Sequence, residues 1–123
     1  MKQSWLSPTL RTMSDILELE DNWNSYGAPP IGPVCVLTAL EFLKDAMADD
    51  TPTPSVVPTS CGGVQIEWHV NSVDLEIEFY PNGKVGCWYE TEEWGESFDD
   101  DDVKNLATLY PLVAKLATQT KGD

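Results

Sequence analysis

The chain has 123 residues, 41% of them hydrophobic, and its 21 acidic residues against 7 Lys and Arg residues give a formal net charge of -14. This length suits one domain with a modest core, and the hydrophobic fraction excludes a disordered chain. The charge exceeds the magnitude of about 2–8 that suffices for solubility, so it repels nucleic acid and anionic membranes and attracts basic surfaces. A halophilic origin would produce the same acidity.

The sequence shows no targeting segment and no cysteine pattern typical of disulfides or metal sites. The first ten residues lack the apolar core of a signal peptide, and no apolar run is long enough to span a membrane. Cys35, Cys61 and Cys87 are an odd number of cysteines without metal-ligand spacing, which argues against disulfides and a zinc site. We therefore expect a cytoplasmic protein without a cofactor, a membrane contact or direct nucleic-acid binding.

The first part of the chain predicts two helices, over residues 8–19 and 33–48, each with apolar residues at helical spacing. Pro8 and Pro33 suit their first turns. The expected inward residues are Leu10, Met13, Ile16 and Leu17 in the first helix and Val36, Ala39, Leu40, Leu43 and Met47 in the second. Between the helices, residues 20–32 form a loop in which we expect Trp23 and Tyr26 to fold back onto the core. An aromatic binding loop is the alternative.

The middle of the chain predicts strands. Residues 64–70 and 73–79 alternate strictly between apolar and polar, residues 85–90 follow, and residues 55–59 suggest an earlier strand. A last helix is expected over residues 99–117, kinked or restarted at Pro111. Its expected inward residues are Val103, Leu106, Leu109 or Tyr110, and Val113. The prediction is an α+β fold of order ααββββα, an antiparallel meander of about four strands with all helices on one face.

Two turns set the register of this meander. The segment 80–84 fits a three-residue hairpin with Gly83 in the left-handed conformation, and Asn71-Ser72 fits a two-residue turn. The expected pairs are Phe79 with Val85, Ile77 with Cys87, Leu75 with Tyr89, Glu78 with Gly86, Glu76 with Trp88, Asp74 with Glu90, His69 with Asp74 and Glu67 with Glu76. This register places the large aliphatic residues inside and the acids outside.

The acids predict a binding surface. On the outer sheet face they surround an exposed tryptophan, and residues 90–102 add eight acids in thirteen residues with no base. The candidate partner-binding residues are Glu67, Asp74, Glu76, Glu78, Trp88, Glu90, Glu92, Glu93, Trp94, Glu96, Asp99, Asp100, Asp101 and Asp102. The alternatives without a binding role are a solvated sheet face and, for two or three of the acids at residues 90–102, the N-terminus of a helix capped by Ser97 or Asp99. A calcium loop is disfavoured because Lys104 stands where its glycine is needed.

Catalysis has little support in the sequence. His69 is the only histidine and is expected to form a surface ion pair with Asp74. Cys61, before two glycines, is the one conceivable nucleophile, and no motif places a base beside it. An enzyme or small-ligand module using Trp23, Tyr26 and either Cys61 or His69 remains the second hypothesis.

A resemblance covers residues 19–90. The run Asn-Trp-Asn-Ser-Tyr-Gly-Ala-Pro-Pro at 22–30, Val-Pro-Thr at 57–59, Gly-Gly-Val-Gln-Ile-Glu-Trp at 62–68 and Asp-Leu-Glu-Ile at 74–77 resemble a recurrent family of small bacterial and phage proteins. That resemblance implies no particular activity. The acidic character, with tryptophans between the acids, resembles that of anti-restriction, anti-CRISPR, antitoxin and immunity proteins, whose carboxylates stand in for phosphates.

The expected partner is therefore the basic surface of another protein, such as a nuclease, a defence complex or a toxin. The expected role is that of an inhibitor acting as a monomer or dimer. A structural homo-oligomer formed through the edge strand at residues 55–59 is the third hypothesis.

Overall fold

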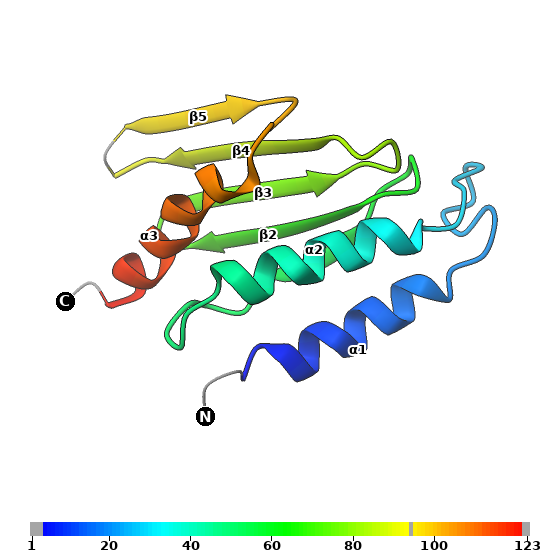
Figure 1. The fold of residues 1–123 in the computed structure, drawn as a ribbon, viewed down its shortest axis with the longest axis horizontal. Coiled ribbons are helices and arrows are strands. Elements are labelled where there is room, and N and C mark those ends of the chain that lie inside the picture. The colour runs from blue at the N-terminus through cyan, green and yellow to red at the C-terminus, as the bar shows by residue number, and fades with distance from the viewer. Residues whose placement is uncertain (1–3, 94, 122–123) are drawn as a thin grey trace.

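Five antiparallel strands lie in sequence order in one sheet, β1-β2-β3-β4-β5, and the helices pack on a single face of it (Figure 1). This is a computed structural model that describes residues 4–93 and 95–121. The described elements are α1 (Leu6–Leu17), α2 (Pro33–Ala46), β1 (Ser55–Pro58), β2 (Val64–Val70), β3 (Val73–Phe79), β4 (Val85–Thr91), β5 (Glu96–Asp100), a 3-10 turn (Leu106–Leu109) and α3 (Tyr110–Lys121). The predicted α+β class and the helices on one face are confirmed.

The strict alternation of β2 and β3 is what builds the core. Ile66, Trp68, Leu75 and Ile77 are almost completely buried, because every second side chain of a strand points to the same face. All of the predicted strand pairs are present, including Glu67 with Glu76, Glu76 with Trp88 and Asp74 with Glu90. The register inferred from alternation and turns is therefore confirmed.

The two predicted turns have the backbone that the register needs. Asn71 and Ser72 both have positive φ, 51° and 66°, as a two-residue hairpin turn of the mirror-image type requires. Gly83 has φ 92°, and Tyr80 closes that hairpin through its backbone bonds with Gly83 and Lys84. Glycine suits this position because it adopts positive φ without steric cost.

The predicted C-terminal helix is wrong in its first part. Residues 96–100 form the edge strand β5, which pairs with β4, and Ser97 and Asp99 lie in that strand and cap no helix. Asn105 accepts a hydrogen bond from the Ala107 backbone N–H and begins the 3-10 turn, and α3 follows from Tyr110. The expected restart near Pro111 is confirmed. The described residues therefore form five strands instead of the predicted four. The additional strand, β5, buries almost no side chain and is held by its backbone pairing with β4.

The helix boundaries and faces differ in smaller ways. Helix α1 begins two residues earlier than predicted and is preceded by the buried Trp5, while Leu10 and Leu17 are exposed rather than inward. Of the residues expected inward on α2, Val36, Ala39 and Leu43 are buried and Leu40 is partly buried; the buried Phe42 adds a contact with the Phe79 ring, whose centroid lies 6.2 Å away.

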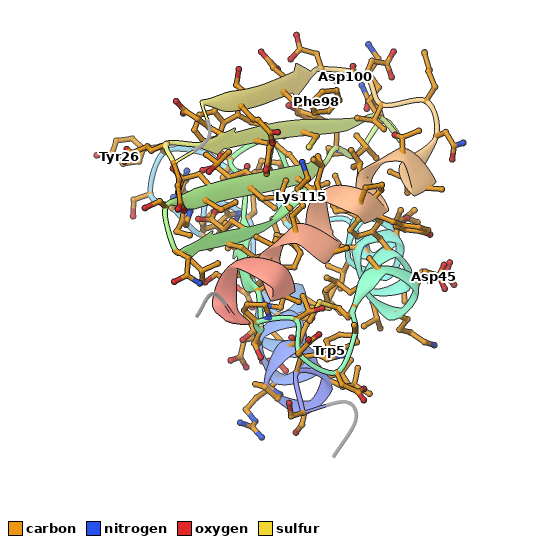
Figure 2. All side chains as sticks on the ribbon, turned by 90° about the vertical axis from the view of Figure 1, so that its left-hand side faces the viewer. Trp5, Tyr26, Asp45, Phe98, Asp100 and Lys115 are labelled. Atoms are coloured by element: carbon orange, nitrogen blue, oxygen red, sulfur yellow. The ribbon has the colours of Figure 1, made fainter. Side chains whose placement is uncertain are left out.

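The loop between α1 and α2 is folded by its asparagines. The Asn24 side-chain oxygen accepts bonds from the backbone N–H groups of Tyr26 and Ala28, and the Asn22 side chain accepts one from Gly27. Trp23 packs against the core, as expected, and its indole N–H donates to the Pro29 carbonyl at 2.8 Å. The expectation for Tyr26 is wrong: its side chain is 92% exposed and points away from the protein (Figure 2).

Candidate partner-binding face

The helix-free face of the sheet gathers half of the predicted acids. We call it the outer face. Register and alternation place on it the side chains of Gln65, Glu67, His69, Asp74, Glu76, Glu78, Trp88, Glu90, Ser97 and Asp99. Six of these ten are carboxylates, and His69 is the only residue among them able to carry a positive charge. Like charges lie directly opposite each other at Glu67–Glu76 and Asp74–Glu90, an arrangement that weakens strand pairing by about 0.2–1 kcal/mol per pair.

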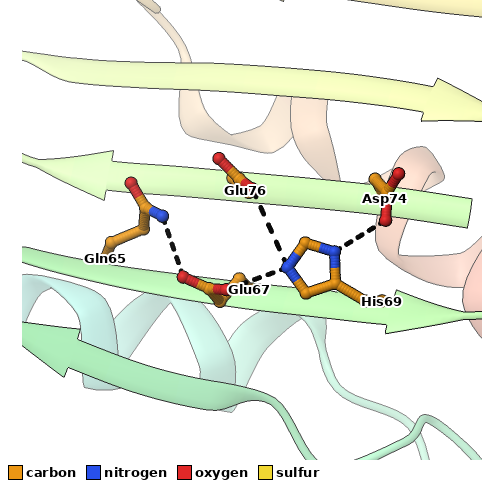
Figure 3. Close-up of polar contacts among 5 residues, drawn as sticks. All are labelled: Gln65, Glu67, His69, Asp74 and Glu76. Carbon is orange, nitrogen blue, oxygen red and sulfur yellow. Dashed lines mark hydrogen bonds and ion pairs between the residues drawn. The ribbon is translucent and has the colours of Figure 1, made fainter.

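His69 holds three of the carboxylates around one ring. Its Nδ1 lies 2.6 Å from Asp74 Oδ1, and its Nε2 lies 2.8 Å from Glu67 Oε1 and 3.8 Å from Glu76 Oε2 (Figure 3). Hydrogen bonds to Asp74 and then to Glu67 raise the pKa of the imidazole above its ordinary value. The expected His69–Asp74 pair is confirmed, and the register adds two further carboxylates to it.

A hollow of about 130 Å³ opens beside this cluster. Gly86 lacks a side chain there, and the Tyr80 ring lies over it: a Cβ on Gly86 would be 3.5 Å from Tyr80 Cε2. Trp88, 39% exposed, borders the hollow together with Tyr80. The carboxylates that line it are Glu76, Glu78, Asp99 and Asp101. A concave site with aromatic and anionic walls suits a cationic group, since cations are attracted both to carboxylates and to aromatic rings.

The structure divides the acids of residues 90–102 among several surroundings. Glu90 and Asp99 join the outer face, whereas Glu96 and Asp100 lie on the helix-covered side of β5, where Lys115 donates to Glu96 at 3.0 Å. Asp102 pairs with Lys104 at 2.8 Å. Glu92 and Glu93 are exposed in the turn after β4, and Trp94 lies outside the described residues. The predicted site is therefore not one continuous surface; its coherent part is the outer face with Asp101 at its rim.

The residues of the enzyme hypothesis lie apart. Cys61 is exposed and approaches Thr59 Oγ1 at 3.3 Å and Glu78 Oε2 at 3.9 Å. His69 contacts Asp74, which lies four residues from Glu78 along β3, or about 13 Å at the usual rise of a strand. Cys61 and His69 therefore sit toward opposite ends of the sheet and do not form a nucleophile–base pair.

Sequence reasoning missed three features of the site. Tyr80 has only the sequence signature of a turn residue, although its position at the end of β3 brings its ring over Gly86. The approach of Glu67 and Glu76 to one imidazole nitrogen is compatible with the predicted register, but the sequence does not specify the side-chain rotamers that produce it. A second hollow of about 330 Å³ lies between β5 and α3 and is bordered by the exposed Phe98 and by Lys115. It depends on β5, which alternation did not reveal.

No described helix is long and apolar enough to cross a membrane. No family model, curated protein or solved structure matches the chain.

Proposed function

We propose that this protein binds a basic surface of a partner protein through the outer face and acts there as an inhibitor. The nuclease of a defence system, a larger defence complex or a toxin would present such a surface, and the role would be of the anti-CRISPR, anti-restriction or antitoxin kind. The observation that carries the proposal is the hollow at Gly86, where Tyr80 and Trp88 stand among four carboxylates on a face without helices.

The energetics of the sheet support this reading. Opposed acids at Glu67–Glu76 and Asp74–Glu90 cost folding stability, so folding alone does not account for them. A basic partner would relieve that repulsion on binding. The helix-capping explanation for the acids at 99–102 does not apply, since neither the 3-10 turn nor α3 has an acid in its first turn.

Tyr80 and Trp88 give the contact an anchor as well as a charge. An arginine side chain offers a planar cation that stacks on aromatic rings and pairs with carboxylates at once. Tryptophan and tyrosine are enriched among the residues that dominate binding energy at protein interfaces. We therefore expect an arginine of the partner to enter the hollow, with the surrounding acids steering the approach.

The edge-strand oligomer gains no support from the geometry. β1 is an edge of the sheet, but Pro58 lies within it and Pro54 directly precedes it. Proline has no N–H to donate to a further strand, and edge prolines commonly block such pairing.

The test compares capture of proteins from the native host by three baits: the wild type, Glu76→Lys with Glu78→Lys, and the control Glu18→Lys with Glu41→Lys. The two variants change the charge equally, and both control positions are exposed on or next to the helices. The proposal is supported if the wild type and the control capture a partner that the outer-face variant does not capture. That partner should also be released when salt is raised to about 0.1 M or more, where charges are screened beyond about 10 Å. Retention by all three baits, or indifference to salt, contradicts it.

A further inference from the structure

Both ring nitrogens of His69 face carboxylates, and a positive charge at Nε2 suits this geometry, supplied either by the proton of the charged imidazole or by a bound cation. If Nδ1–H donates to Asp74 at 2.6 Å, the neutral ring directs the lone pair of Nε2 toward Glu67 and Glu76. Lone pair and carboxylates repel one another unless a positive charge lies between them. We propose that Glu67, His69 and Glu76 form a binding site for a divalent transition-metal ion of the zinc class.

The spacing of the three donors fits one ion. The nearest ligand atoms of Glu67, His69 and Glu76 all lie within 4.8 Å of one another. Metal–ligand bonds of about 2.0–2.2 Å place the ligands of a tetrahedral ion roughly 3.3–3.6 Å apart. The observed distances from Nε2, 2.8 Å to Glu67 and 3.8 Å to Glu76, bracket that range, so side-chain rotation suffices.

Rigid elements hold the three side chains in place. Glu67 and His69 are two residues apart on β2 and share a face, and Glu76 is the cross-strand partner of Glu67 on β3. Sites built on paired strands keep their geometry better than sites on loops.

Two further residues orient the ligands. Asp74 binds Nδ1 of His69 and thereby directs Nε2 toward Glu67 and Glu76, where a metal would bind, as in carboxylate–histidine–metal arrangements. Gln65 Nε2 donates to Glu67 Oε2 at 2.9 Å, which leaves Oε1 of that carboxylate turned toward the imidazole (Figure 3).

The donor set decides the class of ion. One imidazole nitrogen with two carboxylate oxygens suits zinc and its transition-metal neighbours, whereas calcium and magnesium prefer oxygen donors alone. His69 is 47% exposed, so a fourth position on the ion remains open to solvent or to a partner side chain. The site does not depend on the proposed partner and can be tested without one.

The experiment titrates ZnCl₂ into metal-stripped, untagged full-length protein carrying Cys61→Ser, which removes the exposed thiol as a competing ligand. Calorimetry should show one ion per chain. His69→Gln and Glu76→Gln should each weaken binding at least about tenfold, and Asp74→Asn, which removes an orienting partner, by roughly 10–100-fold. Glu41→Gln, with the same charge change on α2, should bind zinc as the parent does.

A second readout needs no variant to fold. His69 is the only histidine, so its imidazole proton and nitrogen resonances report on the site without ambiguity. They should move during the same titration and remain in place when MgCl₂ replaces ZnCl₂.

Three results would overturn the proposal. Zinc could bind while the imidazole resonances stay unchanged, His69→Gln could bind zinc as tightly as the parent, or no binding could occur up to about 1 mM, a Kd equivalent to about -4 kcal/mol. Displacement of zinc by an equal concentration of magnesium would also overturn it, because it would indicate diffuse attraction of cations to the acidic face.

Discussion

Glu76 lies directly opposite Trp88 across β3 and β4, at the centre of the outer face. Glu78 is its neighbour on the same side of β3 and faces Gly86, which has no side chain. Two carboxylates, the exposed ring of Trp88 and the hollow at Gly86 thus lie together on the sheet. Substitutions at Glu76 and Glu78 can therefore test whether the acids serve partner binding or the stability of the fold.

Changing these acids should not damage the fold. In Glu76→Lys with Glu78→Lys, two lysines replace acids within a repulsive field, and surface charges each contribute less than about 1 kcal/mol. We expect a melting temperature equal to or above that of the wild type, measured by circular dichroism, together with loss of partner capture. Unfolding of this variant would show that the two acids support the fold. A folded variant that retains its partner would exclude the outer face as the site.

Core truncation should behave in the opposite way. Ile77 is fully buried among the strands and helices, so Ile77→Ala should reduce the free energy of unfolding by about 2–5 kcal/mol. Leu17→Ala on α1 removes the same class of side chain at an exposed position and should change it by less than about 1 kcal/mol. Urea denaturation of both variants measures the difference. Equal losses would show that Leu17 is packed in solution and that α1 presents the face predicted from sequence.

The contrast between these two residues shows what alternation and periodicity can predict. In β2 and β3 a period of two divides the side chains cleanly, so the core, the faces and the register all followed from sequence. In α1 the buried stripe consists of Thr9, Met13 and Ile16, continued by Trp5 before the helix, and Leu10 and Leu17 fall outside it. β5 has no apolar alternation at all and is held by backbone bonds to β4, which no side-chain pattern reveals.

The candidate site was predictable to the extent that it depends on register. The outer acids and Trp88 came from the pairing of β2, β3 and β4. The hollow at Gly86 did not, because it depends on where the Tyr80 ring settles and on β5 bringing Asp99 and the following Asp101 alongside. Both are three-dimensional consequences of turns and backbone pairing.

The stability that His69 contributes should depend on pH. Its pKa is raised in the folded protein by the bonds to Asp74 and Glu67, so the contribution is fully present below the unfolded value of about 6.5 and is lost as pH rises through the folded value. The melting temperature of the wild type minus that of His69→Gln, measured with EDTA, should therefore be largest near pH 6 and shrink toward pH 9. The ring is half exposed, which keeps the effect below about 1 kcal/mol.

The two proteins differ only at position 69, so the difference in melting temperature cancels contributions from groups that do not contact His69. A difference in melting temperature that stays constant from pH 6 to about pH 9 would mean that Asp74 and Glu67 do not favour the charged imidazole.

Two glycines, Gly86 in β4 and Gly63 directly before β2, should respond differently to alanine. A Cβ on Gly63 would lie 2.3 Å from the Phe79 carbonyl oxygen of the neighbouring strand, so Gly63→Ala must separate β2 from β3 and should destabilise the protein by about 1–3 kcal/mol. At Gly86 the nearest atoms are 3.5 Å away, an ordinary contact, and Gly86→Ala should leave stability within about 1 kcal/mol of the wild type. Thermal melts of the two variants check this. A loss at Gly86 as large as at Gly63 would show that Tyr80 packs more tightly than the structure indicates.

The three cysteines should differ sharply in reactivity. Cys61 is exposed, whereas Cys35 and Cys87 are buried, and burial raises the pKa of the Cys87 thiol to about 12. The thiolate is the reacting species, so a thiol-specific reagent such as Ellman's reagent should label one cysteine of the native protein quickly and all three in guanidinium chloride. Cys61→Ser should abolish the fast phase. Cys61 Sγ contacts Thr59 Oγ1 and Glu78 Oε2 rather than the imidazole of a Cys–His pair, and so the fast phase should be no faster than that of free cysteine at the same pH. A rate far above that of free cysteine would indicate an activated nucleophile and would revive the enzyme hypothesis at Cys61. Rapid labelling of two or three cysteines in the native protein would instead show that the helices do not cover the sheet as described.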